Sequence, residues 1–192
     1  MTPAIQLIQQ GIYESQEKSL AELYHLYSKK LKQFSKAITR SPELAEEAVE
    51  DVFVKLWSNR HKILEIDNLA VYLYVAIKNT SLNILSKNVT AGIRSSFDNM
   101  DIEIGDISPT PYDLLLTAEM MQQLHDAIEP LPPRCKAVFK LVREDGLRYK
   151  EVSEIMNISV NTIDVHMANA IKKIAAVLYS AGFQHLLVKR SE

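Results

Sequence analysis

The sequence predicts an all-α protein built from two small helical domains. Its 192 residues are 47% hydrophobic and include only 5 glycines, and no segment alternates apolar and polar residues as a half-buried strand does. Apolar residues instead recur at helical spacing on both sides of residues 88–111, where the periodicity fails. We therefore expect an N-terminal helical bundle and a C-terminal helix-turn-helix domain, joined by a flexible acidic linker.

Three amphipathic helices are predicted in the N-terminal half, over residues 20–38, 43–60 and 69–85. Ser41 followed by Pro42 is typical of a helix start, because serine caps a helix and a first-turn proline needs no backbone donor. Acidic residues crowd the first half of the second helix, which fits either a core-packing helix or a helix that binds a partner. Residues 63–68 are expected to form a loop, and the helix after them is expected to bury Tyr72 in its apolar stripe.

The segment 131–174 predicts a helix-turn-helix preceded by a supporting helix. Pro132 and Pro133 suit a first helical turn, Gly146 ends the supporting helix, and Asn157-Ile158-Ser159 supplies a break of the expected size. The opposite side of the last helix carries short polar groups and two lysines, which is typical of a helix in the DNA major groove. Its apolar stripe is expected to bury Val160, Ile163, Met167, Ala170, Ile171 and Ile174.

The net charge of −2 hides an uneven distribution along the chain. Residues 1–97 carry 12 basic and 10 acidic side chains, residues 98–129 carry 8 acidic and no basic ones, and residues 130–192 carry 10 basic and 6 acidic ones. Attraction to phosphate depends on charge within about 8–10 Å. The two mildly basic blocks are therefore compatible with DNA binding.

Several kinds of site are not expected. The single cysteine, Cys135, excludes an internal disulfide, and its place on an apolar stripe favours an inert core thiol. No metal-ligand spacing, nucleophile-base pair or phosphate-cradling glycine loop occurs, so we expect no catalytic residues, metal, cofactor or small-molecule substrate. No apolar run approaches the roughly 18 residues that cross a bilayer, and the N-terminus lacks signal-peptide features, so we expect a cytoplasmic protein without membrane insertion.

The order of these segments resembles the group IV (extracytoplasmic-function) sigma factors of bacterial RNA polymerase, in the sigma-70 family. AEEAVEDVFVKLW is similar to the family's polymerase-docking helix, VYLYVAIKNTSLNIL to its promoter-melting helix, and SEIMNISVNTIDVHMANAIKKI to its recognition unit. The resemblance implies a region 2-like domain (1–88), a flexible linker (89–110) and a region 4-like domain (111–192). It also implies an alternative sigma factor that directs promoter-specific initiation and is held inactive by an anti-sigma factor.

The same resemblance implies three sets of contact residues. Family members dock on the clamp helices of the largest polymerase subunit and on the flap, and the docking residues here are Val49, Glu50, Asp51, Phe53, Leu56 and Trp57. The start-proximal promoter element is opened by holding an unpaired base, through Ile66, Asp67, Asn68, Tyr72, Lys78, Asn79 and Asn83. The upstream element is contacted by Arg148, Lys150, Ser159, Asn161, Thr162, Asp164, Val165, His166, Asn169, Lys172 and Lys173.

This sequence departs from the family pattern at three of these positions. The family usually has glutamine at the position of Glu50, and it commonly has lysine or arginine at the positions of Asp164 and Asn169. The last two differences reduce the number of phosphate contacts expected from the recognition helix.

Two other functions remain as alternatives. A stand-alone regulator that binds a two-fold operator as a dimer accounts for residues 131–174 equally well, but it leaves the acid-rich helix and residues 72–85 unexplained. An enzyme is the second alternative, and the lack of any catalytic motif disfavours it.

Overall fold

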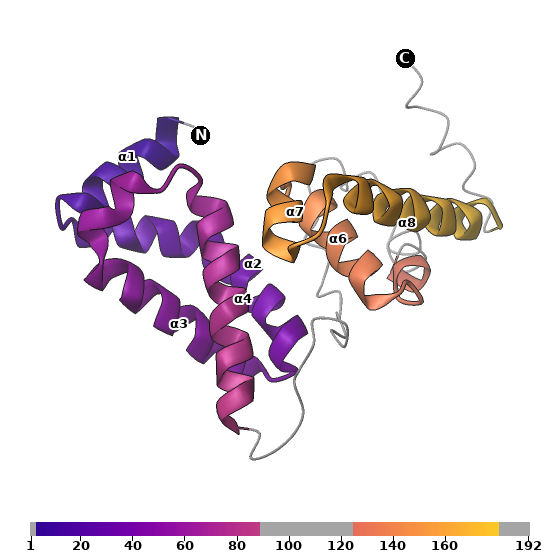
Figure 1. Cartoon of the computed structure of the whole chain (residues 1–192), viewed down its shortest axis with the longest axis horizontal. Coiled ribbons are helices and arrows are strands. Elements are labelled where there is room, and N and C mark those ends of the chain that lie inside the picture. Colours follow the sequence, from indigo (N-terminus) through magenta and orange to yellow (C-terminus); the bar gives the residue numbers. More distant parts are fainter. Residues whose placement is uncertain (1–2, 89–124, 181–192) are drawn as a thin grey trace. The chain divides into compact units, whose positions relative to one another are not determined.

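A computed structural model describes residues 3–88 and 125–180 of the chain (Figure 1). Every element in these two ranges is a helix, which confirms the predicted all-α class. The chain divides into two compact units, Met1–Asp101 and Ile102–Glu192. The predicted linker at 89–110 lies outside the described residues, as do residues 111–124 and the end of the chain.

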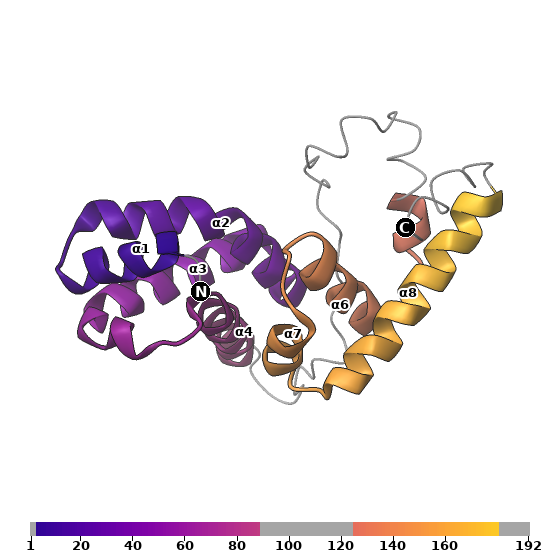
Figure 2. The ribbon, with the colours of Figure 1, turned by 90° about the horizontal axis from the view of Figure 1, so that it is seen from above.

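Unit 1 contains the helices α1 (Pro3–Tyr13), α2 (Glu17–Thr39), α3 (Pro42–Ser58) and α4 (Leu69–Asn88), and the 3₁₀ helix η1 (Arg60–Glu65). Helices α2, α3 and α4 pack against one another. Helix α1 runs beside α2, as Figures 1 and 2 both show, and it also packs on η1. Neither α1 nor η1 is predicted from the sequence, and the prediction of a loop was wrong for residues 63–65, which complete η1.

Local signals explain where the helices of unit 1 begin and end. The Ser41 hydroxyl accepts a hydrogen bond from Leu44 N at 3.2 Å and Pro42 occupies the first turn, so the predicted start of α3 is confirmed. Helix α2 ends at Arg40, which adopts the left-handed conformation with φ 57°. Ser15 also has a positive φ, of 64°, and forms the turn between α1 and α2.

Helix α4 contributes several side chains to the core of unit 1. Tyr74 of α4 packs edge-on against Phe34 of α2, with ring centroids 5.2 Å apart, and is 1% exposed. Because α4 packs against both α2 and α3, it buries more than one stripe, including Val71 and Leu73. Tyr72 is 39% exposed, so the prediction that it is buried was wrong.

Unit 2 contains α6 (Pro133–Arg143), α7 (Tyr149–Met156) and α8 (Val160–Ser180), and each of the three packs on the other two. Pro133 occupies the first turn of α6, as predicted. Asn157 ends α7 in the left-handed conformation (φ 55°, ψ 48°), and Ile158 N donates to Ser153 O at 3.1 Å, so the predicted break is confirmed.

Helix α8 buries a narrower stripe than the sequence predicts. Ile163, Met167, Ala170 and Ile174 are buried, whereas Val160 and Ile171 are 38% and 44% exposed. The prediction was wrong for these two because α6 and α7 cover only one side of α8. Among the helices of residues 3–88 and 125–180, none is long and apolar enough to cross a membrane.

Candidate nucleic-acid and partner interfaces

Helix α3 presents an acidic surface to solvent. Glu47, Glu50 and Asp51 are exposed, and Asp51 forms an ion pair of 3.7 Å with Lys55 one turn later. Such an exposed pair adds little stability. Val54 lies among these carboxylates with 65% of its surface exposed. The acidic surface therefore includes one apolar side chain that is available to a partner.

The predicted docking residues divide between this surface and the core. Val49, Phe53 and Leu56 are 0%, 5% and 2% exposed, so they hold α3 in place from inside unit 1. Glu50 and Asp51 are exposed and Trp57 is half-buried. These three reach the surface together with Val54, which is not among the predicted docking residues. Val54 lies outside the apolar stripe of α3, and this position is the sequence feature that indicates an exposed apolar side chain.

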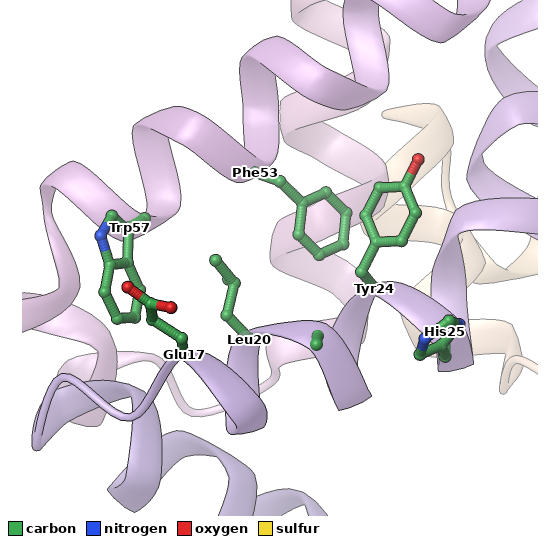
Figure 3. Close-up of a pocket in the computed structure, with 7 residues that line it drawn as sticks. Glu17, Leu20, Tyr24, His25, Phe53 and Trp57 are labelled. Carbon is green, nitrogen blue, oxygen red and sulfur yellow. The ribbon is translucent and has the colours of Figure 1, made fainter.

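A groove of about 530 Å³ lies between α2 and α3 (Figure 3). Tyr24 of α2 and Phe53 of α3 point toward each other, with ring centroids 5.1 Å apart in an edge-on arrangement. The guanidinium of Arg60 lies over the Trp57 ring, 5.0 Å from its centroid. The groove is lined mainly by apolar and aromatic side chains, from Glu17, Leu20, Ala21, Tyr24, His25, Phe53 and Trp57.

The connection between η1 and α4 holds the first residues predicted to contact the start-proximal DNA element. The side-chain oxygen of Asn68 accepts a hydrogen bond from Val71 N at 3.2 Å and caps α4. Asp67 is exposed and Ile66 is half-buried. Leu64, which the sequence analysis missed, is 48% exposed just before them.

The rest of this predicted set lies along α4. Tyr72, Asn79 and Asn83 are exposed and fall seven and four residues apart, which places them in one row on the helix surface. Lys78 is half-buried and lies about 100° around the helix from Asn79. Burial lowers the pKa of the Lys78 ammonium. An aromatic ring and two amides can stack on and hydrogen-bond to an unpaired base.

The surface of α8 carries most residues predicted to contact the upstream element. Ser159 Oγ accepts from Thr162 N at 3.1 Å and lies 2.8 Å from Thr162 Oγ1, so both hydroxyls belong to the N-terminal cap. Among the predicted contact residues beyond this cap, Val165 is an exposed apolar one, with 58% of its surface accessible. The other exposed predicted residues of α8 are Asn161, Asp164, Asn169, Lys172 and Lys173.

His166 is less accessible than most of the other residues of α8 that are predicted to contact DNA. It is half-buried, and burial together with the positive charge of Arg134 lowers the pKa of its imidazole. The Cys135 thiol of α6 donates to His166 O at 3.0 Å, and burial raises the pKa of that thiol. The imidazole is therefore neutral near pH 7, and Cys135 is a structural thiol at the contact of α6 with α8.

Two predicted phosphate contacts lie at the start of α7. Arg148 N donates to Glu151 Oε2 at 2.7 Å, and Arg148 Nη2 forms an ion pair of 2.9 Å with Glu151 Oε1. The Glu151 carboxylate raises the pKa of the Arg148 guanidinium. Lys150 is exposed beside them. The N-terminus of α7 thus presents two cations, one of them already paired with a carboxylate.

Both units match known protein families. Residues 23–90 match the model of Sigma-70 region 2, and residues 121–174 match the model of Sigma-70, region 4. No curated protein sequence matches the chain. Among solved structures, the chain is similar to a structure of CnrH in complex with the cytosolic domain of CnrY. The two chains are 14% identical, the TM-score is 0.56, and the match covers 92% of this chain and 98% of that chain. At this identity the likeness concerns the fold.

Proposed function

Because the chain belongs to the sigma-70 family of RNA polymerase sigma factors, with the two-domain organisation typical of group IV, we propose that it is an alternative sigma factor. It binds core RNA polymerase and directs transcription from its own set of promoters. One observation carries the proposal: a single chain combines a region 2 unit with an exposed acidic helix and a region 4 unit with a helix-turn-helix. Members of this family are transcription initiation factors, and this role needs no catalytic residue of the chain itself.

For core polymerase, the proposed contact is the acidic surface of α3 with Trp57 and the adjacent groove. Exposed carboxylates at Glu47, Glu50 and Asp51 suit a basic partner such as the clamp helices of the largest subunit. Val54 and Trp57 supply apolar contact area within that charged surface. The buried Val49 and Leu56 support the helix without touching the partner, whereas Phe53 contributes to the lining of the groove.

For promoter DNA, the two units take different elements. The end of η1 and its connection to α4, residues 63–68 (called here the base-reading loop), and the row Tyr72, Asn79 and Asn83 on α4 hold an unpaired base of the start-proximal element. Helix α8 reads the upstream element, and the region 4-like unit also contacts the flap of the polymerase. The proposed domain limits stay at 1–88 and 111–192, joined by the linker at 89–110.

Regulation by an anti-sigma factor is the remaining part of the proposal. CnrH, which shares the fold, forms a complex with the cytosolic domain of CnrY. In this chain the apolar groove between α2 and α3 is part of the proposed polymerase contact. A protein that fills this groove would compete with the polymerase. The proposed partners, core polymerase and promoter DNA, are in the bacterial cytoplasm, so the cytoplasm is also the proposed location of this protein.

Run-off transcription with purified core polymerase tests the function. The template is a library of linear DNA fragments that are randomised upstream of a fixed transcribed segment. We expect the protein to select a family of templates with two conserved elements and one transcription start. If it selects no template for transcription but binds an operator alone as a stable dimer, the stand-alone regulator is correct instead.

Charge reversal on α3 tests the polymerase contact. Glu50→Lys is expected to weaken binding to core polymerase by about ten-fold, because it places a cation against a basic partner. Glu22→Lys is the matched control, since Glu22 is an exposed carboxylate of α2 that does not line the groove. Equal affinities of both variants, measured by titration of labelled protein with core enzyme, would remove the proposed contact.

A further inference from the structure

Helix α1 contacts the base-reading loop through one buried side chain. Gln9 is 3% exposed, and its side-chain nitrogen donates to Ile63 O and to Ile66 O, both at 3.0 Å. A primary amide has two N–H donors, so both are used on this loop. Ile63 O also accepts from Ile66 N at 3.2 Å, which closes the last turn of η1. The end of η1 therefore depends on a residue more than fifty positions earlier in the chain.

A second contact ties the start of η1 to the turn after α1. Arg60 Nε donates to Ser15 Oγ at 2.8 Å, and Arg60 Nη1 donates to Trp57 O at 3.1 Å. Ser15 is the residue with φ 64° between α1 and α2. Residues 60–66 are thus held from α1 and its turn at both ends. The region 2 family match begins at residue 23, so α1 lies before it.

The close approach of α1 to α2 depends on Gly11. A β-carbon at this position would lie 2.1 Å from Ser19 Oγ and 2.8 Å from Ser19 Cβ. Any larger residue therefore forces α1 away from α2. Ile8 and Ile12 on the same helix are 7% and 0% exposed, so the buried face of α1 is part of the core.

We propose that α1 is a brace that sets the shape of the base-reading loop, and that Gln9 is its positioning residue. The loop backbone is held from the inside by Gln9, while Leu64 and Asp67 face solvent on its outside. A pocket for an unpaired base requires its walls to be in place before the base arrives, because ordering them on binding reduces affinity. This inference rests on the proposed role of the loop in reading the start-proximal element.

Hydrogen exchange of the full-length protein tests the bracing without any promoter. Gln9→Met keeps the side-chain length and removes both donors, and we expect the Ile66 amide to exchange about ten-fold faster or more. Gln10→Met is the matched control, because Gln10 is the next residue of the same helix, is exposed, and donates from its side chain to Glu14 Oε1. Unchanged exchange over residues 60–68 in Gln9→Met would overturn the brace.

Displacing α1 provides an independent perturbation. Gly11→Ala leaves Gln9 intact but forces α1 away from α2. It should therefore also raise the amide exchange rates of residues 60–66. Adding Ser19→Gly removes both clashing atoms and should restore the protection. If Gly11→Ala leaves the exchange of residues 60–66 unchanged, the position of α1 does not control the loop.

Promoter selection then tests the positioning role. With the randomised template library, Gln9→Met holoenzyme should retain the upstream preference and core affinity of the wild type but lose about ten-fold of its discrimination at the start-proximal bases. A uniform loss of transcription with unchanged base preference would overturn the positioning role. If the wild type itself selects no promoter, the proposed function fails, and the exchange experiment still decides whether α1 braces the loop.

Discussion

Ser35 of α2 and Ser81 of α4 share a hydrogen bond of 2.7 Å between their hydroxyl oxygens, and both side chains are 0% exposed. The bond joins two helices in the core of unit 1 and satisfies two polar groups that water cannot reach. A buried hydroxyl that loses its partner costs more than the bond itself contributes.

Ser81→Ala is expected to lower the free energy of unfolding of unit 1 by about 1–3 kcal/mol, because it leaves Ser35 without this partner. The double variant with Ser35→Ala should lose less than the sum of the two single variants. Urea unfolding followed by the fluorescence of Trp57, the single tryptophan of the chain, measures each value. Ser86→Ala, at an exposed serine of α4, is the control, and additive losses would show that the two hydroxyls are not coupled.

Phe53→Ala is expected to destabilise unit 1 by about 3–5 kcal/mol. The Phe53 side chain is 5% exposed and packs edge-on against Tyr24, so its removal leaves a cavity. Val54→Ala, one position later and 65% exposed, should change the stability by less than about 0.5 kcal/mol. The same fluorescence-monitored unfolding compares them, and similar losses at both positions would contradict the burial pattern of α3.

Asp164→Asn is expected to strengthen binding of the holoenzyme to a promoter selected from the library. Asp164 is the exposed carboxylate on the row of α8 that faces DNA in the proposal, and it repels phosphate. We expect a gain of a few-fold that shrinks as salt is raised. Glu22→Gln makes the same charge change in unit 1 and should have no effect in a filter-binding titration. An unchanged affinity of Asp164→Asn for the promoter would show that DNA does not bind at this row of α8.

Gly146→Ala is expected to destabilise unit 2 through backbone strain alone. Gly146 has φ 75°, and a β-carbon there would meet nothing within 4 Å, so strain arises without a clash. We expect unit 2 to lose about 1–2 kcal/mol, and Gly146→Asn to lose less because asparagine tolerates this conformation better. Hydrogen exchange of the α6 and α7 amides measures both losses, and a larger loss for asparagine would argue against backbone strain.

The His166 imidazole is expected to titrate below its ordinary pKa of about 6.5. Burial and the charge of Arg134 disfavour its protonated form, so the unfolded chain binds this proton more readily than the folded one. Its contribution to stability is therefore present above about pH 6.5 and is lost as the pH falls through the folded-state pKa. An NMR titration of the histidine ring signals, assigned with His166→Gln, gives the midpoint, and a value above 6.5 would contradict the burial of the ring.

The helix-turn-helix shows why part of the structure follows from sequence. Pro133, Asn157 and Ser159 act through their own backbone and nearest neighbours, so the predicted start of α6 and the predicted break before α8 are confirmed in unit 2. The start of α3 at Ser41 and Pro42 is confirmed for the same reason. Local chemistry of this kind needs no knowledge of the rest of the fold.

The exposure of individual side chains on a helix depends on its neighbours. Helical spacing identifies the apolar residues of α3 and α4, but it does not tell that Tyr74 is buried where Tyr72 is not. The family resemblance implies that Val49 and Phe53 contact the polymerase. Both side chains are instead buried in unit 1, where α3 packs against α2 and α4. Periodicity gives the direction of a stripe, and the packing partners set its width.

By itself, the sequence determined the helical class, several local helix starts and stops, and the resemblance that indicates a sigma factor, but it did not reveal α1 or η1. Only the tertiary structure decided which predicted contact residues reach the surface, and it alone joined Gln9 of α1 to Ile63 and Ile66. The physical reason is one of distance along the chain. Capping and periodicity act within a few residues, whereas burial and the satisfaction of buried polar groups depend on segments that meet only after folding.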